Sequence, residues 1–328
     1  MLRIHFTEAD LARTRLALEP DPLWEIALSL HRLQTRQGRT AHAEWYRTTR
    51  ARLADQALDG ALRHLLLPLF PRTAYFPDFL TPAEGVQGLT AGLGAMVDTP
   101  TDRVRREVAR FTSVGAPVWA PRLVERETRQ DLAKVLRRYH EVAVAPYRER
   151  VLARVEADRS VRGRALLAGG ADALLDGLGP QLRWEAPVLH VHYPPEDRDL
   201  RLDGRGLTLL PSYFCWGTPI ALADSSLPPV LVYPVLREAR PVAVDRPLGV
   251  LLGRTRAQVL RGITQGATTG ELARLAGVSA PTVSQHITAL RDAGLISSLR
   301  FGTSVLHTLT PLGAALLRGS GKPVSAVG

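Results

Sequence analysis

The sequence predicts an α+β protein, in which a mostly helical N-terminal region with a small antiparallel β section precedes a separate basic domain. Three observations support this. Apolar residues recur at helical spacing through most of residues 1–177, alternate with a period of two within 186–236, and return to helical spacing over 252–318. A chain of 328 residues is long enough for two domains.

The first part of the N-terminal region is expected to be one strand followed by helices. Residues 2–6 alternate like a strand, and Thr7 with Asp10 indicates a helix start, with the helix continuing through residue 17. Residues 72–98 are rich in Gly, Pro and Thr and are expected to form loops with short turns. Apolar periodicity predicts further helices over these ranges: 22–34, 42–67, 101–111, 128–157 and 160–177.

Residues 186–236 change character and predict the β section. Asp203 and Gly204 are typical of a hairpin turn between two strands. Residues 1–240 are therefore expected to form one region, and 241–251, which contains Pro241 and Pro247, a linker. Alternation predicts strands over these ranges: 187–193, 200–202, 207–214 and 230–235.

Residues 268–296, TTGELARLAGVSAPTVSQHITALRDAGLI, are the most informative segment. Thr268 and Glu271 match the S/T-x-x-E capping box at a helix start. Gly277 stands where this helix would end with a residue in the left-handed conformation. Glycine adopts this conformation without a steric clash because it has no Cβ. Ser279 is placed to cap a second helix, with Pro281 in its first turn. The segment predicts a helix-turn-helix, whose second helix usually lies in the DNA major groove.

The second helix has two chemically distinct faces. Val283, Ile287 and Leu290 coincide at about 100° per residue and are expected to pack inward. Gln285 points away from them and is flanked by small hydroxyl side chains. Glutamine can pair with adenine through two hydrogen bonds, and hydroxyls can serve several base edges. The alternative is an ordinary polar surface helix.

The residues that follow predict a wing. Strands are expected over 295–300 and 305–309, around a turn in which Gly302 provides the positive φ that hairpins favour. Residues 255–263 predict a preceding helix, and Thr310 with Pro311 opens a last one over 312–318. Together these elements predict a winged helix-turn-helix domain over 252–318, followed by a flexible tail at 319–328.

The stretch ELARLAGVSAPTVSQHITALRDAGLI, with a wing and TPLGAALL after it, resembles the ArsR/SmtB-type winged-helix transcriptional regulators. The resemblance covers the last quarter of the chain. It implies DNA binding as a homodimer, usually with repression until an effector releases the protein, and it matches the family's Ser-Gln-His run at Ser284, Gln285 and His286. The family's metal-sensing cysteine motif is absent, which argues against a thiolate metal sensor.

The N-terminal region resembles, more loosely, a domain of unknown function found ahead of ArsR-type winged helices in actinobacterial regulators. The segments FTEADLARTRLA, DPLWEIALSLHRL and LTLLPSYF support this resemblance. It implies a sensing or dimerising role and names no ligand. Five tryptophans either line an apolar pocket for a small-molecule effector or fill the core: Trp24, Trp45, Trp119, Trp184 and Trp216.

The charge balance favours a nucleic-acid partner. The formal net charge is +10, and residues 250–328 hold seven Arg and one Lys against Glu271 and Asp292. Residues 99–165 are also basic. The single cysteine, Cys215, excludes a disulfide within one chain. No apolar run approaches the roughly 20 residues of a membrane span, and the N-terminus lacks a signal-peptide pattern, so we expect a cytoplasmic protein without a membrane partner.

One constellation favours a different class of function. His190 and His192 alternate on a predicted strand, and Glu196 could complete a two-histidine, one-carboxylate metal triad. Pro194 and Pro195 would bend the chain before Glu196, and two such histidines are more often exposed on a polar face. The prediction is therefore no metal, no cofactor and no enzyme activity. The alternatives are a metal-binding or metalloenzyme N-terminal domain joined to the DNA-binding module, and a ligand-independent DNA-binding protein.

The sequence thus predicts a sequence-specific transcriptional regulator, most simply a repressor that a small-molecule effector modulates. A homodimer is expected to bind a pseudo-palindromic operator in double-stranded DNA. Ser284, Gln285 and Thr288 are the predicted base-edge contacts, with Thr282 and His286 as secondary ones. Three arginines are candidates for phosphate or minor-groove contacts: Arg256, Arg291 and Arg300.

Overall fold

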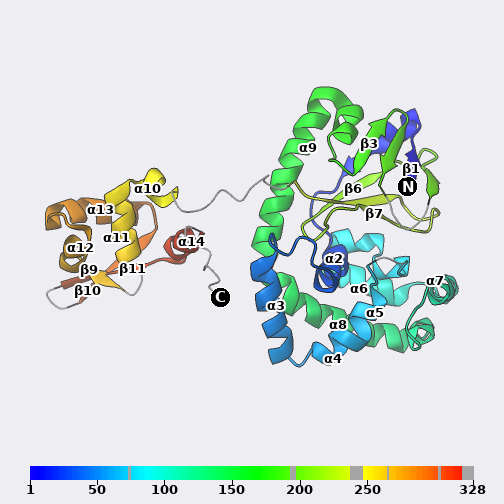
Figure 1. Ribbon diagram of the computed structural model, residues 1–328, viewed down its shortest axis with the longest axis horizontal. Coiled ribbons are helices and arrows are strands. Elements are labelled where there is room, and N and C mark those ends of the chain that lie inside the picture. The colour runs from blue at the N-terminus through cyan, green and yellow to red at the C-terminus, as the bar shows by residue number, and fades with distance from the viewer. Residues whose placement is uncertain (73–74, 193–196, 237–246, 264–265, 302–303, 320–328) are drawn as a thin grey trace. The chain divides into compact units, whose positions relative to one another are not determined.

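The computed structural model describes residues 1–72, 75–192, 197–236, 247–263, 266–301 and 304–319. The chain divides into two compact units, Met1–Leu236 and Arg237–Gly328, which are described separately (Figure 1). Helices dominate, and three small sheets accompany them, so the predicted α+β class is confirmed. No described helix combines the length and the apolar character that crossing a bilayer would require.

The helical part of unit 1 is built around α2 (Pro22–Gln34), in which every residue from Leu23 to Arg32 is buried. Asp21 caps this helix by accepting hydrogen bonds from the amides of Leu23 and Trp24. Because α2 is covered on all sides, apolar residues occupy most of its positions and not only one face. The other helices described in this unit are α1 (Glu8–Arg13), α3 (Ala43–Asp55), α4 (Asp59–Ala61), the π-helical turn η1 (Leu62–Leu66), α5 (Leu67–Leu69), α6 (Leu89–Asp98), α7 (Thr101–Ser113), α8 (Arg126–Ala143), α9 (Arg148–Asp176) and the short 3-10 turns η2 (Asp78–Leu80), η3 (Ala83–Gln87), η4 (Ala120–Val124) and η5 (Ala145–Tyr147).

Several helices differ from the sequence prediction for reasons of packing. Helix α6 forms where loops were expected, because Leu93, Met96 and Val97 enter the core and outweigh the glycines of this segment. The segment expected as one helix over 42–67 is divided into α3, α4 and η1. Helix α9 continues across a break at Gly169 and Gly170, whose backbone angles are not helical.

The β section consists of two four-stranded sheets, in the orders β3-β4-β1-β5 and β2-β6-β8-β7. The antiparallel pairing that the sequence predicts holds for β4 with β1 and β3 and for β7 with β8. The sheets are nevertheless mixed, because β1 pairs parallel with β5, and β6 pairs parallel with both β2 and β8. Strands from the chain start add to strands formed some 190 residues later, and such long crossovers permit parallel pairing. The strands are β1 (Leu2–His5), β2 (Arg15–Leu16), β3 (Leu182–Glu185), β4 (Val188–Val191), β5 (Arg198–Arg201), β6 (Thr208–Ser212), β7 (Ile220–Ala221) and β8 (Val230–Pro234).

The sequence predicts a hairpin turn at Asp203 and Gly204. The turn is present, but the strands beside it do not pair with each other, so the predicted hairpin was wrong. Both residues adopt the positive φ that the turn requires, +52° and +81°. The strands on either side, β5 and β6, nevertheless belong to different sheets. The turn therefore passes the chain from one sheet to the other, a role that local turn chemistry cannot distinguish from a hairpin.

Unit 2 contains five helices and a three-stranded sheet among its described residues. Residues 247–251, expected as linker, belong to α10, whose Leu248 is buried in the core of the unit. Apart from Gly319, the predicted tail at 319–328 lies outside the described residues. The elements are α10 (Pro247–Leu252), α11 (Arg254–Gly262), β9 (Ala267–Thr268), α12 (Thr269–Ala276), α13 (Ala280–Asp292), β10 (Ile296–Phe301), β11 (Ser304–Leu309) and α14 (Pro311–Gly319).

Candidate nucleic-acid interface

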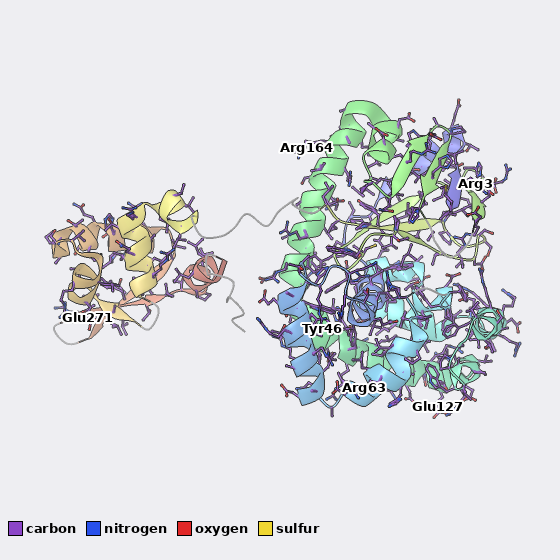
Figure 2. All side chains as sticks on the ribbon, viewed as in Figure 1. Arg3, Tyr46, Arg63, Glu127, Arg164 and Glu271 are labelled. Atoms are coloured by element: carbon purple, nitrogen blue, oxygen red, sulfur yellow. The ribbon has the colours of Figure 1, made fainter. Side chains whose placement is uncertain are left out.

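Helices α12 and α13 meet at the tight turn that the sequence predicts. Glu271, which is labelled in Figure 2, lies at the start of α12. Its carboxylate accepts a hydrogen bond from the Thr268 amide at 2.8 Å, and the Thr268 hydroxyl accepts from the Glu271 amide at 3.4 Å. Gly277 adopts the left-handed conformation, with φ of 65°, and Ser279 caps α13. The capping box, the glycine stop and the serine cap are confirmed, and they fix the entry direction of α13.

Helix α13 buries one face and exposes the other. Val283, Ile287 and Leu290 are buried in the core of unit 2, as predicted. Ser284, Gln285 and Thr288 are exposed. The exposed face therefore presents hydroxyl and amide groups without a charge between Pro281 and Ala289, which are the groups that read base edges in a groove.

Thr282 and His286 lie at the borders between the two faces, and both are half-buried. The Thr282 hydroxyl is 2.8 Å from that of Ser279, and the Thr282 amide donates to the same serine at 3.3 Å. Thr282 therefore already participates in the cap of α13. A base contact by its hydroxyl would have to share or replace the contact with Ser279.

The three candidate arginines lie on three different elements. Arg256 is half-buried on α11, and its Nε has no hydrogen-bond partner within the described part of the chain. Arg291 is exposed near the end of α13, with its Nε 4.0 Å from the carboxylate of Asp292. Arg300 is exposed on β10, opposite Val305. The predicted wing hairpin is present, but the tip residues Gly302 and Thr303 lie outside the described residues.

His307 has a structural position that the sequence does not reveal. It is buried on β11, with Nε2 3.0 Å from the Thr269 hydroxyl and Nδ1 2.8 Å from the Ser298 hydroxyl. Burial, together with the charge of Arg291, lowers the pKa of the His307 imidazole. His307 thus connects the start of α12 to the wing through groups that are 38 and 9 residues away in sequence.

The possible metal triad of unit 1 is not assembled from described residues. His190 lies on β4, with Nε2 3.3 Å from a carboxylate oxygen of Glu185. His192 donates its amide to the Gln181 carbonyl, and Glu196 lies outside the described residues. Within the described ranges, no three His, Cys, Asp or Glu side chains gather as metal ligands would. Cys215 is buried.

The tryptophans do not form one group. Trp24 and Trp45 are buried in the helical core, and the Trp45 indole donates to the Ala143 carbonyl at 2.7 Å. Trp184 packs edge-on against Phe6 in the sheet region, with ring centroids 5.2 Å apart. Core packing therefore accounts for at least Trp24 and Trp45.

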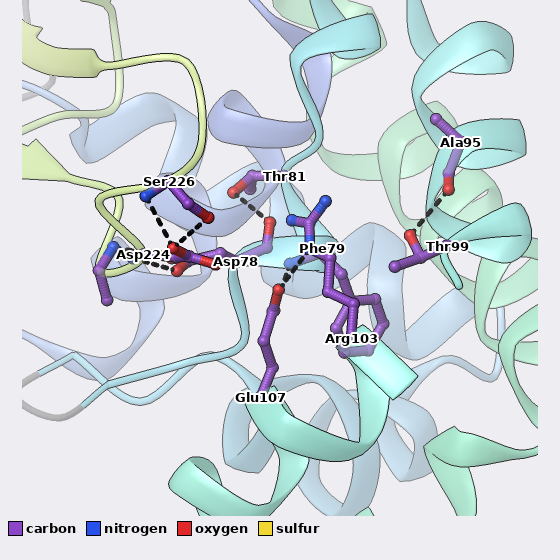
Figure 3. A network of polar contacts seen from close by, with 10 residues as sticks. Asp78, Phe79, Thr81, Ala95, Thr99, Arg103, Glu107, Asp224 and Ser226 are labelled. Atoms are coloured by element: carbon purple, nitrogen blue, oxygen red, sulfur yellow. Dashed lines mark hydrogen bonds and ion pairs between the residues drawn. The ribbon is translucent and has the colours of Figure 1, made fainter. Parts of the chain in front are cut away.

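Buried carboxylates, which the sequence analysis did not single out, join distant parts of unit 1. Asp78 accepts hydrogen bonds from the amides of Ala223 and Asp224, at 3.0 and 2.8 Å (Figure 3). Glu107 accepts from the Phe79 amide and from Arg103, both at 2.7 Å. Burial raises the pKa of Asp78 to about 6. An acid within an otherwise apolar helix, such as Glu25 in DPLWEIALSL, is the sequence signal for such a group.

The arrangement of α11, α12, α13 and the β10–β11 hairpin defines a winged helix-turn-helix, a class of DNA-binding domain. A family model described as "Helix-turn-helix domain" matches residues 251–298. The HTH-type transcriptional regulator Rv2034 of Mycobacterium tuberculosis is 39% identical over 75 residues, which are 23% of this chain and 70% of that protein. The chain therefore belongs to the HTH-type transcriptional regulators.

Two further similarities are shorter or more distant. The HTH-type transcriptional regulator YgaV of Escherichia coli is 43% identical over 44 residues, which are 13% of this chain and 44% of that protein. A solved structure titled "Protein structure of Type III plasmid segregation TubR" aligns with 20% identity and a TM-score of 0.21, over 27% of this chain and 97% of that one.

Proposed function

We propose that this protein is an ArsR-type repressor that binds a pseudo-palindromic operator as a homodimer and is released by a small-molecule effector bound in unit 1. The observation that supports the proposal most strongly is the exposed, uncharged face of α13 formed by Ser284, Gln285 and Thr288. An ordinary surface helix is covered by charged side chains, whereas amide and hydroxyl side chains can form hydrogen bonds with base edges. A cytoplasmic location accords with a DNA partner.

The charge of the C-terminal part of the chain supports this partner. Residues 250–328 hold eight basic side chains against two acidic ones. Arginines in such a domain attract phosphates and release counterions, so the affinity for any DNA decreases with salt. Arg300 on the wing and Arg291 near the end of α13 are the proposed phosphate or minor-groove contacts, and both are exposed. Arg256 would have to extend from a half-buried position.

Exposed apolar side chains in unit 2 support self-association. Val250 and Leu251 on α10 are 81% and 71% exposed, and Leu312 on α14 is 59% exposed. Large apolar side chains exposed on the surface of a small domain can contribute to an interface. A two-fold dimer would repeat the α13 face and therefore read two inverted half-sites about one helical turn apart. Sedimentation of the purified protein with and without operator DNA tests this part of the proposal.

Paired substitutions test base recognition directly. Gln285→Ala is expected to reduce discrimination between operator and mutated operator by roughly 1–3 kcal/mol, because one bidentate base contact is lost. Arg300→Ala is expected to weaken binding to all DNA similarly and to flatten the salt dependence. Gln258→Ala, at an exposed glutamine on α11, is the matched control. If Gln285→Ala and Arg300→Ala reduce binding equally for every DNA sequence, the assignment of α13 as the recognition helix is wrong.

A further inference from the structure

Unit 1 contains a cavity of about 290 Å³ beside the N-terminal end of α2. The segment around η3, the start of α6 and the corner between α8 and α9 form its other walls. The size is close to the lower end of the range for sites that hold small organic molecules. Its apolar lining includes Pro22, Val86, Leu89, Val144, Val151 and Leu152.

Glu25 is one of the residues that line this cavity, and the residue is only 2% exposed. One oxygen accepts a hydrogen bond from the Tyr213 amide at 2.8 Å, and the other accepts from the Phe214 amide at 3.1 Å. Burial, and then the nearby charge of Asp21, raises the pKa of Glu25 to about 7. The Ser212 side chain also hydrogen-bonds to this carboxylate. A carboxylate offers about four acceptor positions, so Glu25 retains acceptor capacity for a ligand beyond these three contacts.

The carboxylates of Asp21 and Glu25 lie one helical turn apart and are both buried. Neither forms an ion pair with a cation within the described part of the chain; both accept hydrogen bonds from backbone amides. Burying a carboxylate without a cation is costly, and a ligand cation would offset that cost. The cavity therefore presents an unneutralised acid against an apolar wall.

The charged groups at the cavity mouth do not reverse this balance. Burial lowers the pKa of His140, which favours its neutral form. Arg148 and Glu19 also line the cavity, but both are exposed, so water screens their opposite charges. Gln87 is exposed and uncharged. The buried charge that a ligand meets is negative.

We infer that this cavity binds a small apolar molecule bearing one amine, whose ammonium group pairs with Glu25. The inference deepens the proposed effector function of unit 1, and rests on it for its regulatory meaning. The apolar part of the ligand would cover Leu89, Val151 and Leu152, while the ammonium donates to the free acceptor positions of Glu25. Ionised Glu25 binds the ammonium, so affinity rises between pH 6 and pH 8.

The cavity is connected to the end of unit 1 through α9, the long helix along one side of this unit (Figure 1). Val151 and Leu152 line the cavity, and Asp158 lies two turns further along. Asp158 accepts hydrogen bonds from the Tyr233 hydroxyl at 2.6 Å and from the Leu236 amide at 2.9 Å. A ligand that displaces the start of α9 would therefore act on the last residues before unit 2.

Calorimetric titration of the full chain with phenethylamine tests the inference, with 3-phenylpropanol and 3-phenylpropanoate as neutral and anionic probes. Phenethylamine is expected to bind at least tenfold more tightly than either. Glu25→Gln is expected to lower its affinity at least tenfold and to change that of the alcohol less than threefold. Gln87→Lys, at an exposed position, should weaken phenethylamine binding, whereas Gln56→Lys on another exposed surface should not.

The inference is overturned if phenethylamine does not bind, if it binds no better than the alcohol, or if Gln87→Lys and Glu25→Gln leave its affinity unchanged. The lysine variants carry the test should Glu25→Gln fail to fold. Because the titration contains no DNA, its failure would not bear on operator binding. Conversely, a protein without operator specificity could still show the amine site.

Discussion

The buried carboxylate of Glu25 makes the stability of unit 1 depend on pH in a defined direction. Its pKa is raised from 4.5 to about 7 in the folded protein, so the folded state binds more protons than the unfolded state between these values. The free energy of unfolding therefore decreases as pH rises through this window. A shift of this size corresponds to about 3 kcal/mol by pH 8, at 1.36 kcal/mol for each pKa unit.

Glu25→Gln removes this dependence, because glutamine does not ionise. The difference in unfolding free energy between the variant and the native protein should therefore shift by about 3 kcal/mol in favour of the variant from pH 5 to pH 8. Any cost of the amide that does not depend on pH cancels in this comparison. All five tryptophans lie in unit 1, so urea unfolding followed by tryptophan fluorescence reports on that unit alone. Glu84→Gln, at an exposed position, controls for the loss of one charge. A difference between variant and native protein that stays constant within about 0.5 kcal/mol over this range would refute the reasoning.

Three further substitutions test the local structure of each unit. Gly277→Ala should destabilise unit 2 by about 1 kcal/mol, because alanine is strained at a φ of +65°, although its Cβ would meet no atom within 4 Å. In a thermal melt, the loss of the helical circular dichroism signal of unit 2 should occur at a lower temperature. The unfolding transition seen by tryptophan fluorescence, which reports on unit 1, should not change. Ser279→Ala should cost unit 2 about 1 kcal/mol by the same measurement, through loss of the α13 cap; an unchanged melting temperature would contradict it. Asp158→Ala should lower the free energy of unfolding of unit 1 by about 3 kcal/mol, measured by urea unfolding, because Tyr233 and Arg162 would lose a buried partner. Asp158→Asn should lower it less.

Unit 2 could be predicted from sequence because its determinants are local. The capping box at Thr268, the stop at Gly277 and the cap at Ser279 each act within four residues, and the structure confirms all three. The inward stripe of α13 follows from helical periodicity alone. The contacts of His307 could not be predicted in this way, because its partners Thr269 and Ser298 come together only when the sheet forms.

Unit 1 could be predicted only in part because its determinants are distant in sequence. The helix over 22–34 was predicted with its observed limits, from its apolar periodicity. The parallel pairing of β1 with β5 and of β6 with β8 depends on crossovers that leave no local pattern, so the sequence predicted only the antiparallel part of the sheets. The cavity beside Glu25 likewise requires α2, α8 and α9 to meet.

The central claim is that this chain recognises a specific DNA sequence, and fluorescence anisotropy measures this most directly. The full-length protein would be titrated against the DNA upstream of its own gene and against scrambled DNA of equal length, at two salt concentrations. We expect at least hundredfold tighter binding to the upstream DNA, with that margin kept at the higher salt. Equal binding to both DNAs, with both affinities falling as salt rises, would contradict it.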